Sequence, residues 1–71
     1  MTQPPITIHL NGQALTLPAP VTLRTLIEQQ GVGAGACAAE VNGKLVPRRD
    51  HESRTLVDGD RIELVTLVGG G

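Results

Sequence analysis

Two Asn-Gly pairs, Asn11-Gly12 and Asn42-Gly43, narrow the possible folds of this sequence more than any other feature. Asn-Gly is the preferred pair for a type I′ turn, because both residues tolerate positive φ, and such a turn joins two adjacent antiparallel strands. Before the first pair, residues Ile6 to Leu10 alternate apolar with polar side chains at period two. After it, residues 14–17 can return antiparallel, so a first hairpin is predicted.

The second Asn-Gly pair has the same surroundings. Residues Cys37 to Val41 alternate in the same way before it, and Leu45 and Val46 begin a short strand after it. Pro47 weakens that strand as an interior member of a sheet, because proline has no N–H to donate. A second, shorter hairpin is therefore predicted.

A helix is predicted between the two hairpins. Pro18 and Pro20 end the first hairpin, and Thr22 can cap a helix that Gly31 is placed to terminate. Its apolar face is formed by Leu23, Leu26 and Ile27. Residues 31–36 are almost entirely Gly and Ala, which have little to bury, so they are expected to form a loop.

The last third of the chain predicts a polar connection followed by one long strand. Residues 48–54 suit an exposed loop or a single helical turn, and Asp58-Gly59-Asp60 suits a tight turn. The strand is expected from Arg61 to Val68, with Ile62 and Leu64 facing inward. The resulting order, strand, strand, helix, strand, short strand, strand, predicts an α+β domain over residues 1–68 with one helix packed across one face of a sheet.

Composition and charge exclude several classes of function. The 71 residues carry a formal net charge of −1 and no Phe, Tyr or Trp, which argues against a nucleic-acid partner. No apolar stretch approaches the ~20 residues that cross a membrane, so no membrane partner is expected. The single cysteine cannot form an internal disulfide, which favours the reducing cytoplasm. No metal-ligand motif and no catalytic constellation is recognisable, so no metal site, no bound cofactor and no catalytic nucleophile is expected.

The end of the chain is the one segment that predicts chemistry. The last strand runs directly into Gly69, Gly70 and Gly71, which we expect to form a flexible reactive tail. Glycines without a Cβ can enter a narrow channel of another protein. The carboxylate of Gly71 is a poor electrophile, but ATP could convert it to an acyl-adenylate, from which a sulfur nucleophile or an amine could displace AMP. The alternative is a loose tail of no consequence, which is common at termini.

Three stretches resemble the thiamine-biosynthesis sulfur carriers of the ubiquitin-like β-grasp superfamily. They are Val41-Asn42-Gly43-Lys44-Leu45-Val46-Pro47-Arg48, then Leu56-Val57-Asp58-Gly59-Asp60-Arg61-Ile62-Glu63-Leu64-Val65, then the glycine terminus. The resemblance implies a β-grasp fold with a mixed sheet of four to five strands and one main helix. It also implies that the protein is not itself an enzyme but a carrier. By the same resemblance, an ATP-dependent activating enzyme adenylates Gly71, a sulfur donor protein supplies the sulfur of a thiocarboxylate, and thiazole synthase accepts it.

Other functions remain open at this point. The small subunit of molybdopterin synthase is also a β-grasp carrier with a terminal glycine pair, although it is typically longer and contains aromatic residues that this chain lacks. A ubiquitin-like modifier would instead join Gly71 to a lysine of a target protein. A third alternative is a purely structural interaction module whose tail is incidental.

The last strand also predicts where partners dock. Period two places Val65 and Leu67 on the outward face beside the tail, where two apolar side chains exceed what the core needs. Among the remaining side chains of interest, Cys37 is expected in the core. His9 is expected to face solvent, and His51 is expected in a solvated loop.

Overall fold

The computed structural model describes residues 3–31 and 37–66 and confirms both hairpins. Strand β1 (Ile6–Leu10) pairs antiparallel with β2 (Gln13–Leu17), and β3 (Cys37–Val41) pairs antiparallel with β4 (Lys44–Val46). The turn residues have the positive φ that a type I′ turn requires. These angles are 49° and 85° at Asn11 and Gly12, and 54° and 82° at Asn42 and Gly43.

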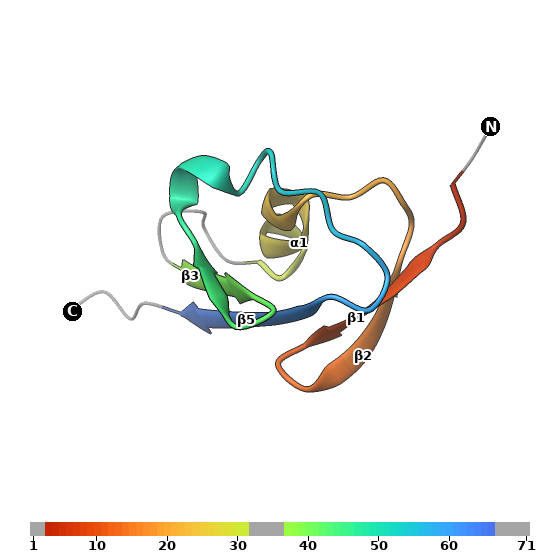
Figure 1. Cartoon of the computed structure of the whole chain (residues 1–71), viewed down its shortest axis with the longest axis horizontal. Coiled ribbons are helices and arrows are strands. Elements are labelled where there is room, and N and C mark those ends of the chain that lie inside the picture. The colour runs from red at the N-terminus through yellow and green to blue at the C-terminus, as the bar shows by residue number, and fades with distance from the viewer. Residues whose placement is uncertain (1–2, 32–36, 67–71) are drawn as a thin grey trace.

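The final strand, β5 (Arg61–Thr66), lies in the middle of a single mixed sheet (Figure 1). The strand order is β2-β1-β5-β3-β4, with β5 parallel to β1 and antiparallel to β3. The two hairpins therefore form the two halves of the sheet, and the last strand in sequence joins them. The predicted α+β fold with one main helix and a mixed sheet is confirmed.

Helix α1 (Leu23–Gln29) begins where the sequence predicts it. The Thr22 hydroxyl accepts a hydrogen bond from the backbone N–H of Thr25 at 3.2 Å, which satisfies one of the free donors of the first turn. Gly31 follows the C-cap residue Gln30 and terminates the helix, and its φ of 75° would strain a residue with a side chain. No helix in the described part of the chain has the length and apolar character of a membrane span.

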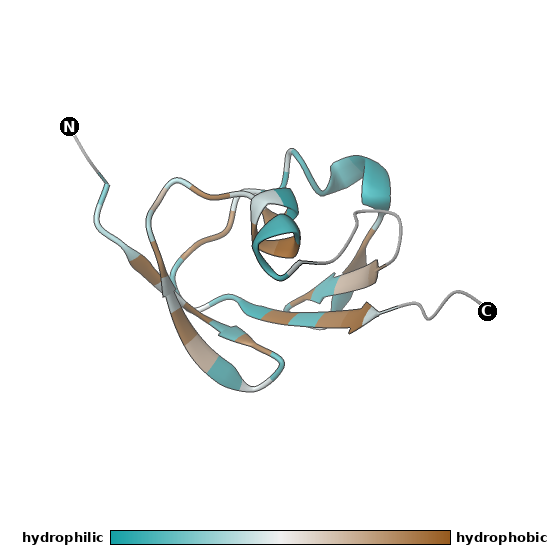
Figure 2. Ribbon diagram, turned by 180° about the vertical axis from the view of Figure 1, so that it is seen from behind, coloured by the Kyte–Doolittle hydropathy of each residue, from teal (hydrophilic) through white to brown (hydrophobic). Residues whose placement is uncertain are grey.

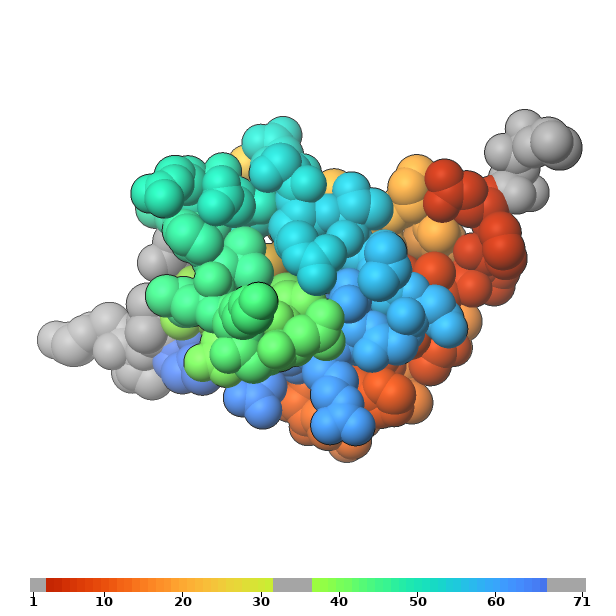
Figure 3. All heavy atoms as spheres, in the orientation of Figure 1, coloured from red at the N-terminus to blue at the C-terminus, as the bar shows by residue number. Residues whose placement is uncertain are grey.

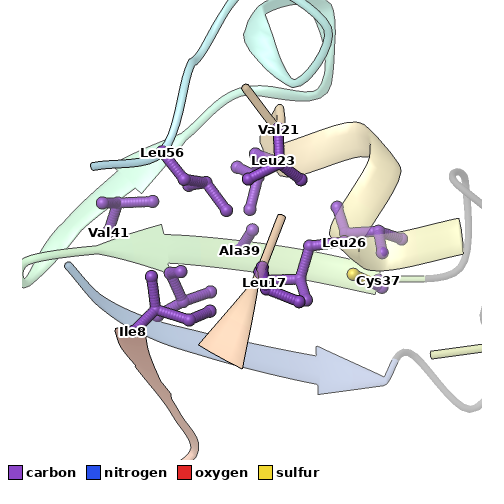
Figure 4. Close-up of a cluster of buried hydrophobic side chains, with 11 residues drawn as sticks. Ile8, Leu17, Val21, Leu23, Leu26, Cys37, Ala39, Val41 and Leu56 are labelled. Carbon is purple, nitrogen blue, oxygen red and sulfur yellow. The ribbon is translucent and has the colours of Figure 1, made fainter. Parts of the chain in front are cut away.

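One apolar core lies between α1 and the sheet (Figure 4). The helix turns its apolar side toward the strands and its polar side outward (Figure 2). The core residues are Ile8, Leu17, Val21, Leu23, Leu26, Ile27, Cys37, Ala39, Val41, Leu56 and Ile62. Cys37 is one of them, as predicted, and burial raises the pKa of its thiol, so the sulfur stays protonated and unreactive at neutral pH.

The prediction that His51 lies in a solvated loop is wrong. The short 3₁₀ helix η2 (Arg48–Asp50) leads directly into His51, whose side chain is only 2% exposed. Its Nε2 donates a hydrogen bond to the carbonyl oxygen of Val46 at 3.0 Å, because a carbonyl can only accept. The neighbouring residues are polar, so the sequence pattern suggested exposure, whereas the helical turn folds this one ring inward.

Asp60 is a second buried polar residue, and the sequence pattern assigned it only to a turn. Its side chain is 3% exposed, and its two carboxylate oxygens accept hydrogen bonds from different segments. One oxygen accepts from Nδ2 of Asn42 and the other from the backbone N–H of Val57, both at 2.9 Å. The guanidinium of Arg54 lies 3.6 Å away. Asp60 thus joins the second hairpin turn to the segment that enters β5.

Replacing Asp60 tests this assignment. We expect Asp60→Ala to lower the free energy of unfolding by about 2–4 kcal/mol, because it leaves the Val57 N–H and the Asn42 amide without their acceptors. Chemical denaturation measures the change. Glu63→Ala removes an exposed carboxylate from the neighbouring strand and should shift the same free energy by less than about 0.5 kcal/mol. Equal stability of Asp60→Ala and the wild type would contradict the structural role of Asp60.

Candidate functional site

The candidate site is the end of β5, from which the glycine tail continues. The described part of the strand ends at Thr66, which is paired with Cys37 of β3. Leu67 and Gly69 to Gly71 lie outside the described residues, as does the predicted end of the strand at Val68. The structure therefore describes the residues of β5 that precede the tail. We call the end of β5 at Thr66 the base of the tail.

On one side, the turn residue Asn11 supports β5. Strand β1 runs beside β5 only at His9 and Leu10, which are in register with Arg61 and Ile62. Beyond this point the side chain of Asn11 takes the place of a strand. Its Oδ1 accepts from the backbone N–H of Leu64 at 3.0 Å, and its Nδ2 lies 3.5 Å from the Leu64 carbonyl oxygen. An amide side chain offers the same donor and acceptor as a peptide group, so it extends the ladder toward the tail.

On the other side, Asn42 supports the start of the same strand. Its backbone N–H donates to the Arg61 carbonyl oxygen at 2.7 Å, and its Oδ1 accepts from the Arg61 N–H at 3.0 Å. The first residue of each Asn-Gly turn therefore also bonds to β5. The sequence analysis assigned both asparagines to their turns only, because contacts with a strand so distant in the chain leave no local signal.

The sheet face opposite α1 carries exposed apolar side chains near the end of β5. Val65 is 58% exposed, as the sequence pattern predicts, and its neighbour in register on β3 is Ala38. Leu45 of β4 is 66% exposed, and register places it on this same face, opposite Glu40. The exposure of Leu45 was not predicted, although its alternation with the half-buried Val46 was a usable signal. Residues of β3, β4 and β5 lie side by side in Figure 3.

Two carboxylates lie between these apolar side chains. Glu40 and Glu63 are directly opposite each other across β3 and β5, and both are exposed. Like charges in this position destabilise a sheet slightly. The outward face is thus apolar at Val65 and Leu45 and acidic between them. We call Val65, Leu45, Glu40 and Glu63 the outer sheet face.

Neither the histidines nor the cysteine add a reactive group to this face. His9 is exposed on β1, as predicted, while His51 and Cys37 are buried. Within residues 3–31 and 37–66, no three His, Cys, Asp or Glu side chains gather closely enough to hold a metal ion.

Comparisons with known proteins place this geometry in context. Residues 8–71 match the family model described as the ThiS family. The chain is 33% identical over 64 residues to the sulfur carrier protein ThiS of Escherichia coli, and the match covers 90% of this chain and 97% of that one.

A longer protein and a solved structure are also similar. The chain is 32% identical over 62 residues to a thiazole synthase of Paramagnetospirillum magneticum, a match that covers 87% of this chain and 19% of that one. The crystal structure of the thiamine biosynthesis protein ThiS from Geobacter metallireducens superimposes with a TM-score of 0.77 at 26% identity, covering 93% of this chain and all of that one.

The two turn asparagines can be tested by a pair of matched substitutions. Glycine keeps the positive φ of each turn but removes the side-chain amide. We expect Asn11→Gly to speed hydrogen exchange at the Leu64 amide and Asn42→Gly to speed it at the Arg61 amide, because each N–H loses its acceptor. Each change should lower the free energy of unfolding by about 0.5–1.5 kcal/mol. Residue-resolved hydrogen exchange provides the measurement, and each variant serves as the control for the other. Unchanged exchange at both amides would show that these side chains do not support β5.

Proposed function

Because this chain belongs to the ThiS family of sulfur carriers, we propose that it carries sulfur on Gly71 for the formation of the thiazole of thiamine. The observation that carries the proposal is the junction of a firmly paired central strand with a terminal run of glycines. A fixed base and a tail without side chains suit the delivery of a carboxylate into the active site of another protein.

The proposed chemistry has two steps. A carboxylate oxygen of Gly71 attacks the α-phosphorus of ATP in an activating enzyme, and pyrophosphate leaves. Sulfide (HS⁻), supplied by a sulfur donor protein, then attacks the carbonyl carbon of the acyl-adenylate, AMP leaves, and the new thioacid loses its proton. The product is a thiocarboxylate. The chain itself is the substrate of both steps rather than an enzyme, and ATP is bound by the activating enzyme rather than by the carrier.

We propose thiazole synthase as the acceptor of the sulfur. In the thiazole synthase of Paramagnetospirillum magneticum, a stretch similar to this chain makes up about a fifth of the longer protein. A carrier-like segment and a synthase in one chain support a direct encounter between the two. This relationship favours thiazole formation over molybdopterin synthesis and over conjugation to a target protein. The unpaired thiol of Cys37 fits a cytoplasmic location.

Docking is proposed to use the outer sheet face together with Leu67. Val65 is the exposed apolar side chain of this face on the strand that continues into the tail. A partner that draws Gly69 and Gly70 into a narrow channel must also cover the end of β5. The activating enzyme and thiazole synthase would therefore use the same surface and exclude each other.

Changing the terminus tests the proposed chemistry. We expect deletion of Gly71, or addition of one residue after it, to abolish adenylation, because the reactive carboxylate moves by ~3.5 Å relative to the nucleotide. ATP–pyrophosphate exchange with the activating enzyme measures the reaction, and the melting temperature should stay that of the wild type. Wild-type exchange rates in both variants would refute the role of Gly71.

Changing Val65 tests the docking surface. We expect Val65→Ser to weaken binding to both enzymes by about 1–2 kcal/mol, because the side chain loses apolar contact only in the complexes. Val57→Ser is a matched control: Val57 is 54% exposed but precedes β5, at the end of the strand away from the tail. Titrations of both variants, with thermal melts, provide the comparison. A lower melting temperature with unchanged affinity in Val65→Ser would place the docking surface elsewhere.

A further inference from the structure

A positively charged cavity lies on the helix side of the sheet, away from the outer sheet face. Its volume is about 500 Å³, and it is lined by Arg24, Arg48, Arg49, His51 and Glu52. Three of the six Lys and Arg residues of the chain line this one cavity, although the formal net charge of the chain is −1. The lining side chains include three guanidinium groups and one carboxylate. We call this the arginine cavity.

The three arginines are weakly engaged within the protein. Arg24 lies 3.4 Å from both Glu28 and Glu52, whose side chains are 59% and 79% exposed. Ion pairs this exposed contribute little to stability and exchange readily with other partners. Arg48 and Arg49 are exposed and form no ion pair with any residue of the described ranges. These guanidinium groups are available to carboxylates from outside.

The backbone holds the arginines in fixed relative positions. The N–H of Arg24 donates to the carbonyl oxygen of His51 at 3.0 Å, and the N–H of Leu23 donates to that of Arg54 at 2.9 Å. These bonds tie the start of α1 to the segment that follows η2. The buried ring of His51, which is hydrogen-bonded to the carbonyl oxygen of Val46, holds the end of η2 against the core. These bonds keep the backbone of the arginines together, so one partner can reach all three side chains.

The arginine cavity is placed to contact a protein that also holds the tail. In Figures 1 and 2, η2 lies at the end of the molecule toward which β5 runs, and the residues of η2 are hydrophilic. η2, which supplies two of the lining arginines, therefore lies at the same end of the molecule as the end of β5. A partner that holds the tail and extends along this end of the molecule can contact both surfaces.

We infer that the arginine cavity is a second docking site, which receives an acidic segment of a protein that takes the glycine tail. The inference rests on the proposed function. A free small anion gains little from guanidinium groups that are exposed to water and screened by salt. An acidic segment of a protein already held by the tail is present at high effective concentration, so several weak carboxylate–guanidinium contacts suffice. Arginine suits this role because its planar donors bind carboxylates in pairs.

Single charge reversals test the arginine cavity. We expect Arg48→Glu and Arg49→Glu each to weaken binding to the activating enzyme or to thiazole synthase by about tenfold at low salt. The difference from wild type should fall to about twofold or less at high salt, because the lost attraction is screened there. Lys44→Glu makes the same charge change at an exposed position of β4 outside the cavity and should bind as the wild type does. The kcat of adenylation at saturating carrier should be unchanged in all three variants, since the tail is intact.

Each other outcome overturns the inference in a distinct way. Wild-type affinity of Arg48→Glu and Arg49→Glu for both enzymes at low salt removes the second docking site and leaves the proposed function standing. If Lys44→Glu weakens binding to the enzymes as much as the arginine variants do, the effect comes from the overall charge of the carrier and not from the cavity. The free carrier could also bind inorganic tripolyphosphate saturably and lose this binding in both arginine variants. If the affinities for the enzymes stay unchanged at the same time, the cavity is a small-anion site. Absence of adenylation of the wild type refutes the proposed function and the inference together.

Discussion

The structure depends on the pairing of β5 with both halves of the sheet. Each half is a hairpin closed by an Asn-Gly turn, and each turn asparagine also bonds to β5. The same two residues therefore supply the positive φ of the turns and the hydrogen bonds that hold the central strand. Asn42 further positions the buried carboxylate of Asp60, which fixes the segment entering β5. A domain of this size has a thin core, so polar contacts of this kind carry much of the specificity of its fold.

Under the proposed function, this arrangement separates the paired sheet from the segment of the chain that carries the chemistry. The paired strand provides a fixed origin for the glycine tail, and no side chain of the described residues has to take part in bond making. In the proposed function, the folded domain contributes recognition, through the exposed apolar and acidic side chains of the outer sheet face and through the arginine cavity on the helix side. In that proposal, two docking surfaces raise the affinity for a partner, while the chemical step depends on the tail. The two carboxylates Glu40 and Glu63, which cost the sheet a little stability, fit a surface shaped for binding.

The sequence predicted the features that depend on neighbours in the chain. The turns, the Thr22 cap, the Gly31 helix end and the outward direction of Val65 follow from local conformational preference and period-two alternation. The burial of His51 and the strand-supporting role of Asn11 were not predicted, because each depends on contacts that only the tertiary fold creates. The resemblance to sulfur carriers, which rests on stretches that include the Asn42-Gly43 turn and the start of β5, identified the family correctly. The predicted roles of Leu67 and of Gly69 to Gly71 concern residues outside the described ranges, and they stay predictions.

The most direct test of the central claim is the intact mass of the protein after incubation with ATP, an activating enzyme and a sulfide source. A sulfur carrier gains about 16 Da at its terminus, because one carboxylate oxygen is replaced by sulfur. Fragmentation should assign the gain to Gly71, and omission of ATP should abolish it. An unchanged mass under conditions in which an established sulfur carrier is converted, or a gain located at Cys37 instead of Gly71, would contradict the account.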